Sequence, residues 1–269
     1  MNSPPSTGEV APERVLSMIE AKSQEICDAL DQVDPIGLGA ASRLTGWTRL
    51  TLACHLRYGA QATRQVIEAT LDGRPGAFYP GGRELQRPFT LRPALGESAA
   101  HVVESLGHEV AELHRTLIGL DDEAMASLII EHPDNRDLGE MTIGDLVRMR
   151  LTEVQAHGDD LDLGLSPWPS DFGKAVIAQR AARLRQRPLN WAGWEVILVV
   201  TDASALSATV SAEGIELHAR PVEVMAASRL VGTANAHVAM LLGRRAEADL
   251  TKEGDVEQAQ ACLASVIGP

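Results

Sequence analysis

The chain has 269 residues, 45% of them hydrophobic and 23% charged, a composition that excludes wholesale disorder. Its 24 basic and 37 acidic residues give a net charge of −13. Such a surface repels the phosphates of nucleic acids and of anionic membranes, so we expect neither as a partner. No stretch approaches about 18 consecutive apolar residues, and the first residues lack the pattern of a secretory signal, so a cytoplasmic protein is expected.

The first half of the chain has the pattern of a helical bundle. Apolar residues recur at a spacing near 3.6 in four segments, and Thr142 with Asp145 resembles a capping box at the start of the last one. The predicted helices cover residues 12–31, 48–71, 97–118 and 143–161. Residues 1–11 are expected to form a flexible tail, and the proline- and glycine-rich residues 73–96 a long ordered loop or lid. A four-helix bundle over residues 12–165 follows.

The pattern changes after Trp168, where runs rich in β-branched residues begin to alternate with helical ones. The predicted helices here cover residues 171–186, 222–242 and 255–266, and the predicted strands 195–202, 206–212, 215–219 and, as an edge strand, 246–250. The three consecutive strands have the spacing of a hairpin and meander. The sequence therefore predicts a smaller α+β domain over residues 166–269, and an α+β class for the whole chain.

The three cysteines, Cys27, Cys54 and Cys262, are odd in number, widely spaced and without a C-x-x-C pair. A disulfide framework and a cysteine-based zinc site are therefore not expected. Reduced thiols agree with a cytosolic compartment.

Two residues of the fourth predicted helix suggest a metal site. Glu153 and His157 are four apart, so both side chains leave the same helix face one turn apart and can share one ion. An exposed helix also carries such a pair by chance. His55 is the natural third ligand, because its helix face is mostly small or polar, with Leu52 as the exception. From this face alone, a buried histidine bonded to a backbone carbonyl explains His55 equally well.

Two imidazoles and one carboxylate would leave a coordination position open, as catalytic zinc sites do. An open zinc ion can bind a thiol and deprotonate it, which gives a nucleophile at neutral pH. Zinc is favoured by the ligand types, and nickel or iron would also be accepted by such a set.

The same residues resemble a known family. The run GWTRLTLACHL (46–56) looks like the W-T-x6-H-L opening of mycothiol-dependent enzymes in the DinB-like metalloenzyme superfamily, and LTEVQAHGDDL (151–161) resembles their E-x3-H-x2-D-L segment. The resemblance implies a DinB-like four-helix bundle with His55, Glu153 and His157 as metal ligands. It also implies mycothiol as a thiol co-substrate.

The resemblance extends to the C-terminal half. The run AHVAMLLGRRAEADLTKEGD (236–255) is similar to a segment of the sterol-carrier-like domain that follows the bundle in mycothiol-dependent maleylpyruvate isomerases. It implies a role in activity for Arg244, which would bind a carboxylate of substrate or thiol through its planar fork. A solvated surface arginine is the alternative for that residue. Asp160, one turn past His157, is expected to orient that imidazole, unless it is a surface charge or a helix cap.

Three further residues are candidates for binding mycothiol: Arg83, Arg87 and Tyr58. The two arginines belong to the run FYPGGRELQRPFTLRP (78–93), whose proline-rich second half does not look like the corresponding segment of the isomerases. Substrate would be selected in this loop.

Three functions remain open at this point. The first is a metal-dependent transferase that places mycothiol on an electrophilic small molecule. The second is a mycothiol-dependent maleylpyruvate cis–trans isomerase, in which the thiolate adds to the double bond, the adduct rotates and the thiolate leaves. The third is a non-catalytic protein that binds a thiol conjugate or a partner protein. The departure in residues 78–93 favours the first, and both a monomer and a homodimer are compatible with the sequence.

Overall fold

The chain divides into two compact units, Glu13–Pro167 and Trp168–Pro269, the second of which also takes in Met1–Pro12. The computed structural model describes residues 10–134, 136, 138–184, 196–202, 207–211, 214–218, 228–244 and 249–265. Most of the predicted flexible tail, residues 1–9, lies outside the described residues.

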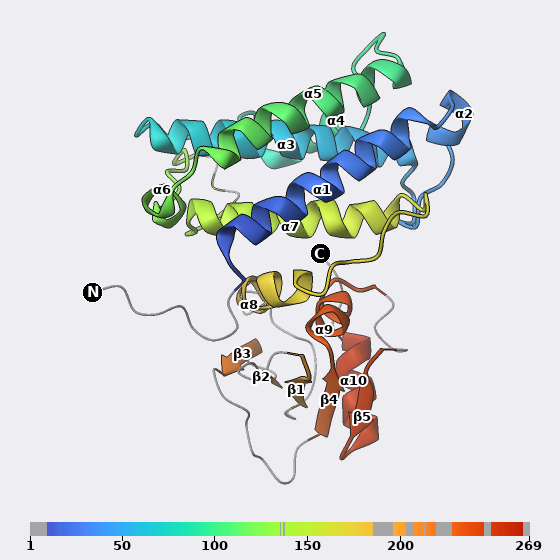
Figure 1. Ribbon diagram of the computed structural model, residues 1–269, viewed down its shortest axis with the longest axis vertical. Helices are drawn as coiled ribbons and strands as arrows, with labels where there is room; N and C mark the ends of the chain where they lie inside the picture. The colour runs from blue at the N-terminus through green and yellow to red at the C-terminus, as the bar shows by residue number, and fades with distance from the viewer. Residues whose placement is uncertain are drawn as a thin grey trace. The chain divides into compact units, whose positions relative to one another are not determined.

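Four long helices form the N-terminal unit and lie alongside one another (Figure 1). They are α1 (Pro12–Asp31), α3 (Arg49–Leu71), α5 (Ala99–Ile118) and α7 (Ile143–Asp160). The predicted bundle is therefore confirmed, with every helix end within two residues of its predicted position. Three short helices in the connections were not predicted: α2 (Pro35–Leu38), α4 (Arg83–Thr90) and α6 (Asp122–Ala126). No helix in the described part of the chain has the length and apolar character needed to cross a bilayer.

Side chains cap the long helices at their N-termini. The hydroxyl of Thr48 accepts the N–H of Thr51, which fixes the start of α3. At the start of α7, Thr142 and Asp145 form the predicted capping box, each side chain accepting the other's backbone N–H. These bonds satisfy N–H groups that have no partner within a helix.

The apolar faces of the helices meet in one continuous core. Its buried members are Ile26, Leu30, Leu38, Leu52, Ala53, Cys54, Leu56, Val102, Val103, Leu106, Val154 and Leu161. Burying one leucine or isoleucine side chain contributes about 1.5–3 kcal/mol, so this cluster contributes substantially to the unit's stability. α3 is the central element, because it packs against both α5 and α7.

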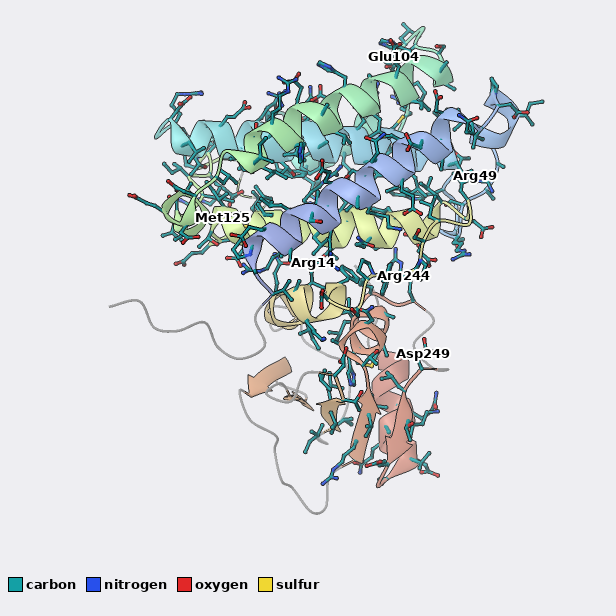
Figure 2. All side chains as sticks on the ribbon, viewed as in Figure 1. Arg14, Arg49, Glu104, Met125, Arg244 and Asp249 are labelled. Atoms are coloured by element: carbon teal, nitrogen blue, oxygen red, sulfur yellow. The ribbon has the colours of Figure 1, made fainter. Side chains whose placement is uncertain are left out.

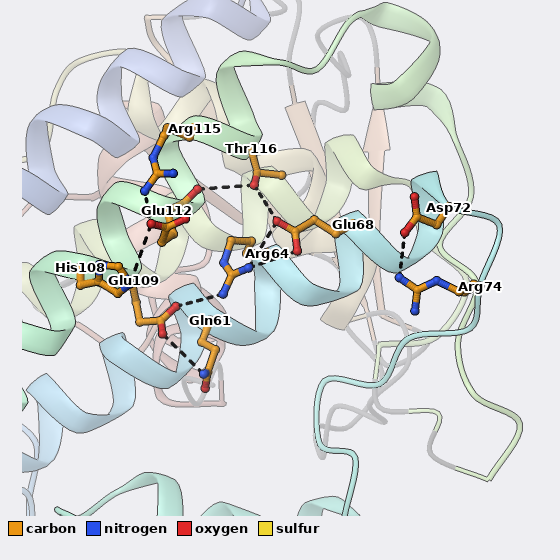
Figure 3. A network of polar contacts seen from close by, with 10 residues as sticks. All are labelled: Gln61, Arg64, Glu68, Asp72, Arg74, His108, Glu109, Glu112, Arg115 and Thr116. Atoms are coloured by element: carbon orange, nitrogen blue, oxygen red, sulfur yellow. Dashed lines mark hydrogen bonds and ion pairs between the residues drawn. The ribbon is translucent and has the colours of Figure 1, made fainter.

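Polar contacts fix the ends and the outer side of the bundle. Arg49, at the start of α3, donates its Nε to the carbonyl of Leu161 at 2.9 Å and its Nη1 to that of Gly37 at 3.2 Å (Figure 2). Arg64 of α3 pairs with Glu68 of the same helix at 3.1 Å and with Glu109 of α5 at 3.4 Å (Figure 3). These contacts are partly exposed and each is worth little on its own, but together they restrict how α3 can slide against its neighbours.

Residues 76–97 cover part of α3, and we call them the α4 segment. They are not the plain loop that was predicted, because residues 83–90 form α4 despite Pro88. The segment is fastened to α3 near both ends. Tyr58 donates its hydroxyl to the carbonyl of Phe78 at 2.6 Å, and Arg57 donates to both carboxylate oxygens of Glu97, at 2.5 and 3.2 Å.

The C-terminal unit has a five-stranded sheet in the order β3-β2-β1-β4-β5. Its strands are β1 (Val196–Val200), β2 (Ser207–Ser211), β3 (Gly214–His218), β4 (Ser228–Gly232) and β5 (Thr251–Glu253). Its helices are α8 (Phe172–Leu184), α9 (Ala234–Leu241) and α10 (Val256–Ser265). The meander β1-β2-β3 is antiparallel as predicted, and β4 returns parallel to β1. The predicted α+β class is confirmed.

Two predictions in this unit were wrong. The helix expected over residues 222–242 is in fact strand β4 followed by α9, since residues 228–232 pair with β1; residues 219–227 lie outside the described part. Of the expected edge strand over residues 246–250, residues 249 and 250 precede the strand, and residues 246–248 lie outside the described part. The strand at the edge of the sheet is β5, which begins at Thr251. A short apolar strand followed by an apolar helix gives one continuous run of apolar residues in the sequence. Hydrophobic periodicity alone does not show where the strand ends and the helix begins.

Candidate functional site

The contact between His55 and Glu153 is the centre of the site. His55 lies on α3 and Glu153 on α7, where the two helices pack together. The Nε2 atom of His55 is 3.3 Å from Oε1 of Glu153, and the two side chains are only 17% and 16% exposed. Two groups that are far apart in the sequence thus meet in a largely dry environment.

The third predicted ligand, His157, lies beside this pair. Its ring centroid is 4.9 Å from that of His55, and the two rings are nearly perpendicular. The indole of Trp47 flanks both rings: its ring centroid is 5.4 Å from that of His55 and 6.3 Å from that of His157. The structure therefore brings all three predicted ligands together. Among the residues that the structure describes, no group of three or more His, Cys, Asp or Glu side chains is arranged as a formed metal site.

Asp160 contacts His157 directly. Its Oδ2 lies 2.9 Å from Nδ1 of His157, and the aspartate is 2% exposed. It is thus not a surface charge. A carboxylate at Nδ1 favours the tautomer with the proton on that atom, which leaves the lone pair on Nε2.

A buried arginine on α7 was missed in the sequence. Arg150 is 1% exposed and donates its Nη1 to Oε2 of Glu153 at 2.7 Å and to the carbonyl of Leu56 at 3.2 Å. The signal was the R-x-x-E spacing on the helix face that carries the predicted ligands. Arginine is almost never fully buried unless it is paired, and here Glu153 is the partner.

The protonation states of the pair follow from this environment. Burial lowers the pKa of His55 to about 4, although the carboxylate of Glu153 opposes the shift, so the imidazole is neutral at pH 7. Burial alone would raise the pKa of Glu153, but the positive charge of Arg150 and the two imidazoles outweigh it, and the pKa is lowered. A neutral imidazole and an ionised carboxylate are the forms that bind metals. The Nδ1 atom of His55 is buried without a hydrogen-bond partner.

The two cysteines whose side chains the structure describes, Cys27 and Cys54, are poor nucleophiles. Burial raises the pKa of Cys27 and of Cys54 to about 11, so both remain thiols at neutral pH. The side chain of Cys262 lies outside the described part of the chain.

The predicted mycothiol-binding residues lie on the α4 segment or beneath it. The guanidinium of Arg87 lies over the ring of Trp47, 5.9 Å from its centroid, which places it next to the two histidines. Arg83 lies over the ring of Tyr79 at 5.4 Å. Tyr58, which stacks on Tyr79 at 5.3 Å, uses its hydroxyl to hold the α4 segment. Of the three, Arg87 is the residue adjacent to the His–Glu–His cluster.

Arg244 belongs to the C-terminal unit. It follows α9 and Gly243, whose φ of +67° ends the helix. Its Nη1 donates to the carbonyl of Leu242 at 2.6 Å. The role in anion binding that the resemblance implies for Arg244 stays a prediction.

The N-terminal unit is thus a helical bundle in which two histidines and a glutamate meet between α3 and α7, and an α+β unit follows it in the chain. Residues 19–162 match the family model described as the mycothiol maleylpyruvate isomerase N-terminal domain. The match spans more than half of the chain, and the chain belongs to this family. The resemblance seen in the two sequence motifs is thereby confirmed.

Solved structures agree with this assignment. The chain is similar to the crystal structure of the mycothiol-dependent maleylpyruvate isomerase, with a TM-score of 0.65 and 19% sequence identity over 91% of this chain and 93% of that one. A second crystal structure of that enzyme, carrying a histidine-to-alanine substitution, matches with the same values. At this identity the likeness establishes the fold. None of the curated proteins matches the sequence.

Proposed function

We propose that this protein is a mycothiol-dependent cis–trans isomerase of a small unsaturated acid. The observation that carries the proposal is the family match over residues 19–162, within which His55, Glu153 and His157 lie together. In such a reaction the thiolate of mycothiol adds to a carbon–carbon double bond. The resulting single bond rotates, and elimination of the thiolate restores the double bond in the other configuration. Sulfur is not retained in the product.

A divalent metal ion fits the residues of the cluster. His55, Glu153 and His157 would hold it, and zinc suits two imidazoles and one carboxylate. The separation of 3.3 Å between His55 Nε2 and Glu153 Oε1 is short enough for both atoms to bind the same ion. When bound, such an ion lowers the pKa of a thiol, so that the thiolate is available at neutral pH.

The chain's own residues prepare the site for this chemistry. Asp160 holds the proton of His157 on Nδ1 and leaves Nε2 as the donor atom. Arg150 keeps Glu153 ionised in a buried position. Trp47 shields both imidazoles from water on one side, and the half-buried guanidinium of Arg87 above it offers a positive charge to a carboxylate of the substrate.

Transfer of mycothiol to an electrophile is the second candidate. It is favoured by the departure of residues 78–93 from the isomerase pattern, since these residues form the α4 segment that carries Arg87. The site residues and the thiol are the same in both reactions. The two differ in whether the adduct eliminates the thiolate or is released with the sulfur attached.

Mass spectrometry of the products distinguishes the candidates. The zinc-loaded protein is incubated with mycothiol and maleylpyruvate, and separately with a panel of alkylating electrophiles. The products are first separated by chromatography, which resolves the cis and trans isomers. Isomerisation then gives a new peak of unchanged mass, whereas transfer gives a conjugate that contains mycothiol and has lost the leaving group of the electrophile. His157→Ala removes a ligand and should abolish both turnover and most of the bound metal. The control His101→Ala, on the exposed side of α5, should change neither. Binding of mycothiol without turnover of any compound would contradict both enzymatic candidates.

A further inference from the structure

Gly59 lies in the middle of α3, one turn after His55, in a position where glycine is unfavourable. Glycine in a helix interior is less stable than alanine, because it loses more conformational freedom on folding. Here, however, a Cβ atom at residue 59 would come within 2.7 Å of both carboxylate oxygens of Glu153. The carboxylate therefore occupies the space that a side chain of α3 would fill.

Arg150 holds the same carboxylate from its own helix. The guanidinium donates to Oε2 at 2.7 Å, and its second bond, to the carbonyl of Leu56, ties it to α3. Since Oε2 is engaged by Arg150, the other oxygen, Oε1, is the one that lies 3.3 Å from Nε2 of His55. The two oxygens of Glu153 thus have different neighbours.

We infer that Gly59 and Arg150 are positioning residues: together they allow the Glu153 carboxylate to lie against α3 with a single oxygen, Oε1, directed toward His55. Gly59 provides the space, and Arg150 fixes the rotation of the carboxylate within it. Glu153 then presents one donor atom next to the imidazole instead of two. The inference rests on the proposed function, in which His55, Glu153 and His157 bind a divalent metal.

A merely structural role would have a different consequence. If Gly59 served only close helix packing and Arg150 only the fold, their substitution would change stability and leave the metal affinity of the folded protein unaltered. If they position Glu153, the metal affinity falls even where the fold is retained. The two readings separate when affinity and stability are measured on the same variants.

The experiment measures zinc affinity of the full chain by competition with a chromophoric chelator, and thermal unfolding of the zinc-free protein. Gly59→Ala should bind zinc at least tenfold more weakly, since the added methyl group displaces the carboxylate. Gly107→Ala is the matched control: residue 107 lies within α5 with nothing within 4 Å of its Cβ position, so affinity should stay within twofold. Arg150→Met should also weaken binding tenfold or more, and Arg150→Lys should recover part of the loss by keeping the charge.

Each result decides the matter. Wild-type affinity in Gly59→Ala, or an equal change in Gly59→Ala and Gly107→Ala, overturns the inference for Gly59. If Gly59→Ala does not fold, the Arg150 variants remain, and equal affinities of Arg150→Met, Arg150→Lys and wild type overturn the positioning role. If the wild-type protein binds no zinc, nickel or iron, the proposed metal site itself is wrong. This outcome is distinct from failure of the positioning role, because it is seen in the wild type before any variant is compared.

Discussion

The contact between Asp160 and His157 allows a sharp test of how the imidazole is prepared. Asp160→Asn keeps the size of the side chain and replaces a charged acceptor with a neutral one. The bond spans 2.9 Å and the carboxylate is 2% exposed, so water does not screen it. A hydrogen bond to a charged group contributes about 1.5–3 kcal/mol and a neutral one about 0.5–1.5 kcal/mol.

The difference of about 1–1.5 kcal/mol corresponds to a loss of roughly tenfold in metal affinity, at the lower end of the range for residues that support a metal ligand. The assay is zinc competition with a chromophoric chelator at pH 7.5, with circular dichroism to verify the helices. Asp159→Asn is the control, because its side chain is 38% exposed and pairs with Arg43 away from the imidazole. If Asp160→Asn binds zinc within twofold of wild type, or if Asp159→Asn weakens binding equally, Asp160 does not orient His157.

Two further predictions concern stability. Burial lowers the pKa of His237, which is 0% exposed and lies 3.0 Å from the carbonyl of Val199 through Nε2. The unfolded chain takes up this proton near pH 6.5 and the folded chain only at lower pH, so stability should be constant above about pH 6.5 and fall below it. Between pH 5 and 8, the melting temperature of His237→Gln should fall less on acidification than that of the wild type. Parallel curves for the two proteins would show that His237 does not cause the loss of stability. Arg57→Ala should lower the free energy of unfolding in urea by about 1.5–3 kcal/mol, because the side chain of Glu97, which is only 10% exposed, loses its bond to the guanidinium. Arg74→Ala, in an exposed ion pair, should change it by less than about 0.5 kcal/mol, and similar losses in both would refute the reasoning.

The long helices were predictable because their signals are local. Thr48 and Thr142 cap helices whose apolar residues repeat at 3.6 spacing, and both signals lie within a few residues of the element that they define. The α4 helix was not predictable, since Pro88 and its neighbouring glycines have the composition of a loop. That helix is stabilised by what it covers, with Arg87 over Trp47, and not by its own propensity.

The three proposed metal ligands could be predicted from motif spacing, whereas the residues around them could not. Glu153 and His157 share a helix face, and the first motif adds His55. The burial of Arg150 and the space above Gly59 depend on how α3 and α7 pack, which no local pattern encodes. Packing between distant segments decides which charged side chain becomes a partner and which stays in water.

The way the α4 segment is fastened has a consequence for how such enzymes diversify. One anchor is the carbonyl of Phe78 and another the N–H of Ala94, which donates to Glu97 at 2.7 Å. Any residue supplies the first group, and any residue except proline supplies the second. Leu85 and Phe89, in the stretch between them, are 75% and 64% exposed. Exposed positions such as these two can therefore be exchanged while the attachment points persist. Substitutions at exposed positions of the α4 segment can therefore alter which substrate is accepted, without disturbing the helices that carry His55, Glu153 and His157.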